Sequence, residues 1–116
     1  MNTNQHVIDA LFNALLVENT QRYREALLRP VDGKRDVYGQ ARNALSALEA
    51  NEKEAVLRFI NLAVADSVSI VLGTLDGSFF PEGISGDFVV NYDGSEIQGD
   101  LQDLFLEKAQ DAGVFR

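Results

Sequence analysis

Six carboxylates in the last third of the chain are the side chains whose type and spacing suggest chemistry. They are Asp87, Asp93, Glu96, Asp100, Asp103 and Glu107. The last three are spaced i, i+3 and i+7, which places them on one face of a helix. Paired carboxylates act as general acid and base, or hold a divalent cation such as Mg²⁺. Because acids also favour a helix N-terminus, the pattern favours a capping and surface role over catalysis or metal binding.

Residue types that other kinds of site require are missing or rare. The chain has no cysteine, which excludes disulfides, thiolate nucleophiles and cysteine-ligated zinc. Its single histidine, His6, lies in the first turn of an expected helix, where an isolated imidazole is typical of the surface. Neither a dinucleotide-binding glycine pattern nor a Walker lysine pattern is present. We therefore expect no cofactor and no metal.

The net charge of −8 is concentrated in the second half of the chain. Residues 1–58 hold eight acidic and eight basic side chains, whereas residues 59–116 hold ten acidic and two basic ones. A clustered acidic surface attracts a cationic partner and makes binding sensitive to salt. Residues 22–42 carry a net charge of +3. The sequence leaves open whether that basic segment is a solvated face or covers the acidic half.

The stretch around which these groups must be positioned is residues 51–75. At about 100° per residue, its apolar side chains cover one half of a helical wheel, and Arg58, Asn61, Asp66 and Ser69 lie on the other. This pattern predicts a long central helix that buries a broad face. The predicted face consists of Val56, Leu57, Phe59, Ile60, Ala63, Val64, Val68, Ile70, Val71 and Leu75.

The ends and the middle of that helix carry further expectations. Asn51 is the expected N-cap, and Gly73 with Asp76-Gly77 is expected to end the helix. Ser67 lies near the middle of the apolar arc and is expected to be a core serine. Partial alternation over residues 67–75 keeps a buried strand as the alternative.

Shorter elements flank the central helix. An apolar stripe predicts a helix over residues 4–17, and helicity either resumes at residues 21–28 or runs through to them, ending before Pro30. A helix over residues 37–50 with Asp36 as its cap is expected next. In the acidic half, Asp93-Gly94 between two short runs predicts a hairpin.

The whole pattern predicts one α+β domain over residues 1–116. Three to four helices form a core around the helix at 51–75, followed by a β-hairpin at about 87–98. Asp100 is expected to cap a final helix at about 100–112. The N-terminus lacks the basic region of a secretory signal, and Arg58, Asn61 and Asp66 interrupt the most apolar window. We therefore expect a cytoplasmic protein without a membrane span.

The preferred function is a non-enzymatic binder whose acidic C-terminal half meets a basic protein, as an immunity or inhibitor protein would meet a nuclease toxin. The predicted contact residues are Phe79, Phe80, Asp87, Tyr92, Asp93, Glu96, Asp100, Asp103 and Glu107. The three aromatic residues supply anchors, although Phe79 and Phe80 also suit packing on the core. The alternatives are a carboxylate-based or divalent-metal enzyme, and a helical oligomerisation module. We expect no nucleic acid partner, and a monomer or a homodimer.

Overall fold

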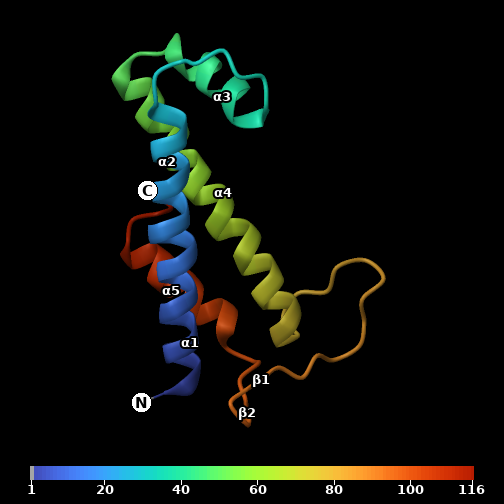
Figure 1. The fold of residues 1–116 in the computed structure, drawn as a ribbon. Coiled ribbons are helices and arrows are strands. Elements are labelled where there is room, and N and C mark those ends of the chain that lie inside the picture. Colours follow the sequence, from blue (N-terminus) through green and yellow to red (C-terminus); the bar gives the residue numbers. More distant parts are fainter. Residues whose placement is uncertain (1) are drawn as a thin grey trace.

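The computed structural model describes residues 2–116 and shows a helical frame with one small hairpin (Figure 1). The helices are α1 (Thr3–Phe12), the π-helical segment η1 (Asn13–Asn19), α2 (Thr20–Leu28), α3 (Val37–Ser46), α4 (Ala50–Asp76) and α5 (Leu101–Asp111). The strands are β1 (Asn91–Tyr92) and β2 (Ser95–Glu96). This order confirms the predicted α+β fold, with its long central helix, C-terminal hairpin and final helix.

The chain begins with one continuous helical run from α1 to α2, then passes through a loop and α3 and returns along α4 (Figure 1). The run passes from α1 to α2 through η1, so the polar residues near 18–20 do not break it. The Thr20 hydroxyl, which is buried, donates a hydrogen bond of 2.6 Å to the Leu16 carbonyl. The run ends at Leu28, as predicted from Pro30.

Helix α3 begins at its predicted cap but ends earlier than predicted. Asp36 Oδ1 accepts a hydrogen bond of 2.8 Å from the Gly39 amide. A Cβ on Gly39 would lie 2.1 Å from the Lys34 carbonyl oxygen, so this turn requires a glycine. The helix stops at Ser46 rather than at residue 50, because the chain must turn before α4 begins.

Helix α4 is helical throughout, which excludes a strand over residues 67–75. Its cap is Glu49 rather than Asn51, and a capping box forms in which Glu52 Oε1 accepts a 2.8 Å hydrogen bond from the Glu49 amide. It ends at Gly77, which has a left-handed φ of 78°. Gly73 does not end the helix. It is buried, and a Cβ there would meet the Gln102 side chain at 2.6 Å.

The predicted buried face of α4 is right only at its edge, where Leu57 is buried and Val64 and Val68 pack against the main core, and it is wrong at its centre. The residues that α4 buries are Leu57, Ala65, Ser69, Leu72 and Gly73. Their mean direction is rotated by roughly 140° from the centre of the predicted face, at 100° per residue. Phe59 is 67% exposed and Val71 is 58% exposed, although both belong to the predicted face. Ser67 is also exposed, and the buried serine is Ser69, whose hydroxyl donates to the Asp66 carbonyl at 2.9 Å.

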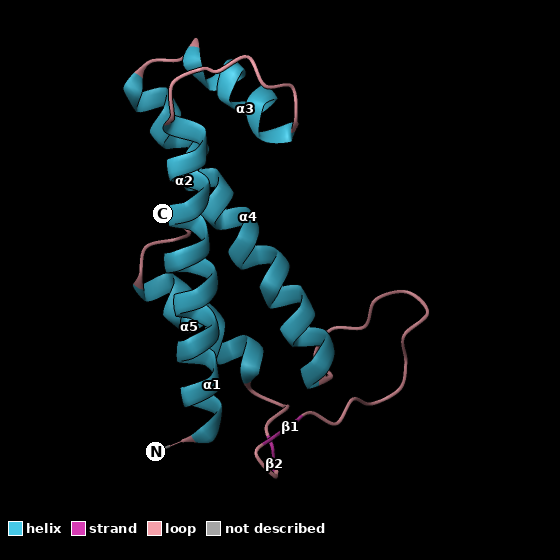
Figure 2. Cartoon of the chain, viewed as in Figure 1, coloured by secondary structure: helices cyan, strands magenta, loops and turns pink. Residues whose placement is uncertain are grey.

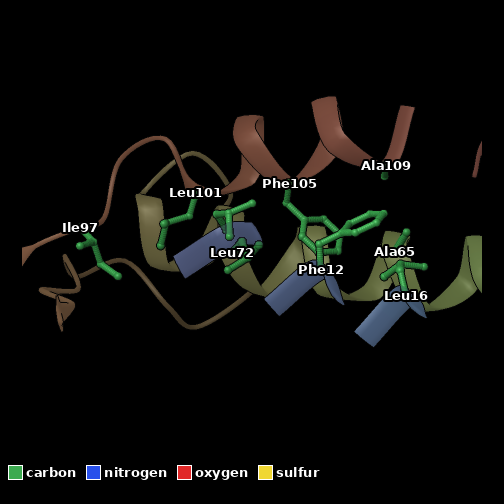
Figure 3. Close-up of a cluster of buried hydrophobic side chains, with 9 residues drawn as sticks. Phe12, Leu16, Ala65, Leu72, Ile97, Leu101, Phe105 and Ala109 are labelled. Carbon is green, nitrogen blue, oxygen red and sulfur yellow. The ribbon is translucent and has the colours of Figure 1, made fainter. Parts of the chain in front are cut away.

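The reason for this rotation is close packing against α5 and the α1–η1 run. The main core contains Ile8, Phe12, Leu16, Ala65, Leu72, Ile97, Leu101, Phe105 and Ala109 (Figure 3). Phe12 and Phe105 lie with ring centroids 5.6 Å apart at its centre. Small residues on α4, such as Ala65 and Gly73, let the neighbouring helices approach, whereas a face of large side chains would hold them apart. A second cluster joins Leu27, Leu45 and Leu57 at the α3 end.

The hairpin is shorter than predicted but has the predicted turn. Asn91 pairs with Glu96 and Tyr92 with Ser95, and residues 87–90 precede the ladder as loop (Figure 2). Asp93 and Gly94 have φ values of 49° and 81°, as a two-residue hairpin turn requires. The hairpin is attached to the main core through Ile97, which is 4% exposed.

Helix α4 also has the length and composition of a membrane-spanning helix, the only one within residues 2–116 to do so. Its most apolar window is 22% buried. Asp66 lies inside the helix and is exposed.

Candidate acidic interaction surface

The nine predicted contact residues fall into three groups in the structure. Phe79, Phe80 and Asp87 lie in the long loop between α4 and β1, Tyr92, Asp93 and Glu96 lie on the hairpin, and Asp100, Asp103 and Glu107 lie at the start of α5 or along it. The hairpin and the start of α5 meet beside the first turn of α1. The Phe79 amide instead donates to the Gly73 carbonyl at 3.1 Å, which holds this aromatic pair against the end of α4.

Asp100 occupies the N-cap position of α5, as predicted, but the side chain that caps the helix is that of Asp76, which corrects the prediction. The Asp76 carboxylate accepts hydrogen bonds from the amides of Gly99 at 2.7 Å, Leu101 at 3.2 Å and Gln102 at 2.7 Å. The Asp100 side chain makes no capping hydrogen bond. The last residue of α4 therefore satisfies the free amides of α5 and fixes the two helices to each other. Its partners are more than 20 residues away in sequence, so no local pattern identifies it.

Asp100 has a different partner in the structure. Its carboxylate accepts a hydrogen bond from the Asn4 side-chain amide, which also donates to the Ile97 carbonyl at 2.9 Å. Asn4 and Asp100 are both partly buried. Asp100 thus joins α1 to the start of α5, and its carboxylate is less available to a partner than the sequence suggested.

Asp103 and Glu107 are fully on the surface of α5. They lie one helical turn apart, whereas Leu101, Phe105 and Ala109 face the core. The neighbouring base, Lys108, forms an ion pair of 3.1 Å with Asp9 on α1. A hydrogen bond from Gln5 and this Lys108 contact hold the pKa of Asp9 below its usual value. Lys108 is therefore engaged with α1, and Asp103 and Glu107 form no ion pair within residues 2–116.

The hairpin adds a second acidic group beside α1. The exposed Tyr92 ring has its centroid 6.3 Å from that of His6. A hollow of about 300 Å³ is lined by Thr3, His6, Tyr92, Asp93 and Ser95. Although these include a hydroxyl, an imidazole and a carboxylate, no hydrogen bond between side chains joins any two of the five in the described chain. Nucleophilic catalysis requires a hydroxyl hydrogen-bonded to its base, and this hollow does not have that arrangement.

The basic segment 22–42 makes its contacts within the front half of the molecule. Arg24 forms two hydrogen bonds with Glu54, of 2.5 and 2.7 Å, which lower the pKa of the Glu54 carboxyl. Arg42 is 4% exposed, and its Nε donates to the Ala26 carbonyl at 2.8 Å while Nη1 contacts Asp32 at 3.2 Å. The expectation of a solvated basic face is wrong for Arg42, which joins α3 to the end of α2.

That result answers the question of whether the basic segment covers the acidic half. Within residues 2–116, no ion pair joins residues 22–42 to the acids of residues 76–111.

The described chain also contains no group of three or more histidine, aspartate or glutamate side chains arranged to hold a metal ion. No family model, curated protein or solved structure matches the chain. The local geometry is therefore the basis for a functional conclusion.

Proposed function

We propose that this protein is a non-enzymatic, cytoplasmic binding protein that presents the acidic surface of α5 and the hairpin to a basic protein. The observation that carries the proposal is the absence of a cation over these acids in residues 2–116. Asp93, Asp103 and Glu107 are exposed, and none pairs with a lysine or an arginine there. An uncompensated acidic surface attracts a cationic one over distances beyond direct contact.

The hairpin supplies an anchor beside these charges. Tyr92 is 44% exposed, and its ring is supported by His6 on one side. An exposed tyrosine offers a partner both apolar area and a hydroxyl, which is typical of binding hot spots. A partner with a basic, nucleic-acid-binding surface, such as a nuclease toxin, has the complementary charge, and an immunity or inhibitor role is the form of binding that we favour.

The enzyme alternative has less support in the same residues. Asp76 caps α5, and Asp100 is bound to Asn4. Of the three carboxylates spaced along the start of α5, Asp103 and Glu107 remain free, and they lie on a convex helix surface. General acid–base catalysis needs such groups positioned around a bound substrate, usually in a concave site.

Charge reversal on α5 tests the proposal. The double variant Asp103→Lys/Glu107→Lys should lose capture of the partner from a lysate of the native host, while the wild-type protein captures a basic protein that elutes as salt is raised. The matched control is Glu18→Lys/Glu25→Lys, two exposed acids on η1 and α2. Both doubles change the net charge by the same amount, so a difference between them reports position and not total charge.

The proposal fails if both double variants capture the partner equally well, or if neither does so with an unchanged fold by circular dichroism. Loss in both would mean that total charge alone drives the association. Retention in both would mean that the contact surface lies elsewhere. In each case the acidic surface of α5 would lose its assigned role.

A further inference from the structure

One side of α4 is apolar and uncovered along most of its length. We call it the open face and define it by Val56, Phe59, Ala63, Ser67, Ile70 and Val71, all of which are exposed. Figure 1 shows α1 and α5 on one side of α4 and no element along the other. Phe59 is 67% exposed, an unusual state for a phenylalanine in the middle of a long helix.

The molecule as a whole has more surface than its mass requires. Its accessible surface is 7674 Å², whereas a folded monomer of 12.8 kDa has about 6,300 Å². The excess of about 1,400 Å² exceeds the roughly 800 Å² that each partner contributes to a standard interface. Its radius of gyration of 17.2 Å is likewise larger than the roughly 13 Å of a compact chain of this length. Contact with a second molecule of similar size would bring the ratio of accessible surface to mass back to its usual value.

We propose that the open face binds a second copy of this chain, with the two α4 helices antiparallel and the two-fold axis beside Ala63. This inference is independent of the proposed function, because Asp103 and Glu107 lie on α5 and remain free. Val56 and Ile70 stand seven residues before and after Ala63, the repeat of paired helices. An antiparallel pair therefore places Val56 of each copy opposite Ile70 of the other, with alanine against alanine between them.

The sizes of the side chains fit this register. Phe59 and Ser67 stand four residues before and after Ala63, so the antiparallel arrangement places each Phe59 ring opposite the serine of the other copy. A large side chain then fills the space that a small one leaves. Because Ala63 and Ser67 are small, the two helices can approach closely at the axis, and the large residues pack on either side.

Charge favours the antiparallel arrangement over the parallel one. Figure 1 shows α3 and the loop of residues 77–90 at opposite ends of α4, both projecting away from α1 and α5. The α3 end adjoins the basic segment 22–42, and the loop end carries Asp76, Glu82 and Asp87. Antiparallel pairing keeps the two acidic loop ends apart and places each beside the α3 end of the other copy, where the charges of residues 29–54 balance. Parallel pairing would oppose like ends and set Asp66 against Asp66.

Apolar side chains continue the surface at both ends. On α3, Val37 is 82% exposed and Tyr38 is 43% exposed. On the loop, Phe79 is 43% exposed and Phe80 is 56% exposed. In the antiparallel dimer, Val37 and Tyr38 of each copy face Phe79 and Phe80 of the other copy, once at each end of the contact. The loop aromatic residues then belong to the contact between copies, rather than to the surface that meets a basic partner.

A lipid bilayer is the competing occupant of this face, since α4 is long and apolar enough to cross one. Asp66 lies exposed near the middle of the helix, where a charge in hydrocarbon is costly. The opposite side of α4 is packed against α1 and α5, which carry exposed acids such as Asp103 and Glu107. These charges would have to enter the membrane together with α4. A protein surface accommodates the open face without that cost.

Sedimentation of the full chain tests the dimer. Wild-type protein should sediment at about twice 12.8 kDa and dissociate on dilution. The variant Phe59→Asp should weaken dimerisation about tenfold or more, because the charge is buried at both symmetric positions. Phe115→Asp is the matched control, since Phe115 is an exposed phenylalanine off the open face and should leave the dimer intact.

The absence of cysteine allows a clean test of orientation. Ala63→Cys should form a covalent dimer on mild oxidation. Under the same mild oxidation, Val56→Cys and Ile70→Cys should each form no covalent dimer alone, but should cross-link to each other when mixed in equal amounts. Self-cross-linking of Val56→Cys at the rate of Ala63→Cys would instead demonstrate a parallel pair and overturn the antiparallel arrangement.

Two other results would overturn the proposal entirely. One is a wild-type chain that stays monomeric at every concentration up to hundreds of micromolar. The other is a dimer that Phe59→Asp and Phe115→Asp weaken equally. Flotation with phosphatidylcholine vesicles is the third arm: a monomer that floats with vesicles, and loses this with Phe59→Asp, would assign the open face to lipid.

Discussion

The two faces of helix α4 differ in the size of their side chains and in their exposure to solvent. The closed face, with Ala65, Leu72 and Gly73, is rich in small residues and lies against α5 and η1. The open face, with Phe59 and Val71, carries larger apolar side chains and is exposed. Hydrophobicity alone would bury the open face first. Shape decides otherwise, because helices pack where their surfaces allow close approach.

This contrast teaches that an apolar helix face has two uses. A face of small residues with a few large ones forms an intramolecular contact at once, since the neighbouring helices belong to the same chain. A face of large residues around a small centre remains available for a second molecule. The following substitutions compare the faces in protein diluted until it sediments as a monomer.

The largest difference is expected between two phenylalanines. Phe105→Ala removes a ring with no exposed surface and should lower the free energy of unfolding by about 3–5 kcal/mol. Phe59→Ala removes a ring that is already solvated and should cost less than about 1 kcal/mol. Urea unfolding followed by circular dichroism measures both. Similar losses at the two positions would mean that the open face is covered within the monomer.

The second comparison enlarges an alanine on each face. Ala65 is fully buried, so Ala65→Leu overfills the main core and should cost about 1–3 kcal/mol. Ala63→Leu adds its methyl groups to solvent and should leave the free energy of unfolding nearly unchanged, because both residues are good helix formers. Thermal melts of the two variants provide the measurement. A loss at Ala63 as large as that at Ala65 would contradict the assignment of faces.

The third comparison concerns the joint between α4 and α5. Asp76→Ala removes the carboxylate that accepts from three backbone amides and should cost about 1 kcal/mol, as the loss of a helix cap does. Asp103→Ala removes an exposed acid from the first turn of the same helix and should cost less than about 0.5 kcal/mol. Hydrogen exchange at the Leu101 and Gln102 amides should accelerate in the first variant and not in the second.

The smallest effect is expected at the far end of α4, where Arg24 contacts Glu54. The hydrogen bonds from Arg24 lower the pKa of the Glu54 carboxyl below its ordinary value of 4.5. The folded state therefore holds this carboxylate ionised more readily than the unfolded state does. Its contribution to stability is complete above pH 4.5 and is lost as pH falls through the lower value. Melting temperatures across acid pH should decline less steeply for Glu54→Gln than for Glu107→Gln.

The candidate site could be predicted only in part, and its residues show why. The exposure of Asp103 and Glu107 follows from local helical spacing, because the apolar residues between them define the opposite face. The engagement of Asp100 with Asn4 joins positions 96 residues apart in sequence. The capping role of Asp76 likewise depends on where α4 ends relative to α5. Contacts between residues so far apart in sequence leave no local periodicity, so no sequence pattern predicts them.

By itself, the sequence determined the helices, the hairpin turn and the separation of charge, because these depend on neighbours within a few positions. The effects of Pro30 on the end of α2, of Asp36 on the start of α3 and of Asp93-Gly94 on the hairpin turn are all local. Only the tertiary structure decided which side of α4 is buried. That choice depends on the fit between surfaces, and a helical wheel records how apolar each side is but not how closely another helix can approach it.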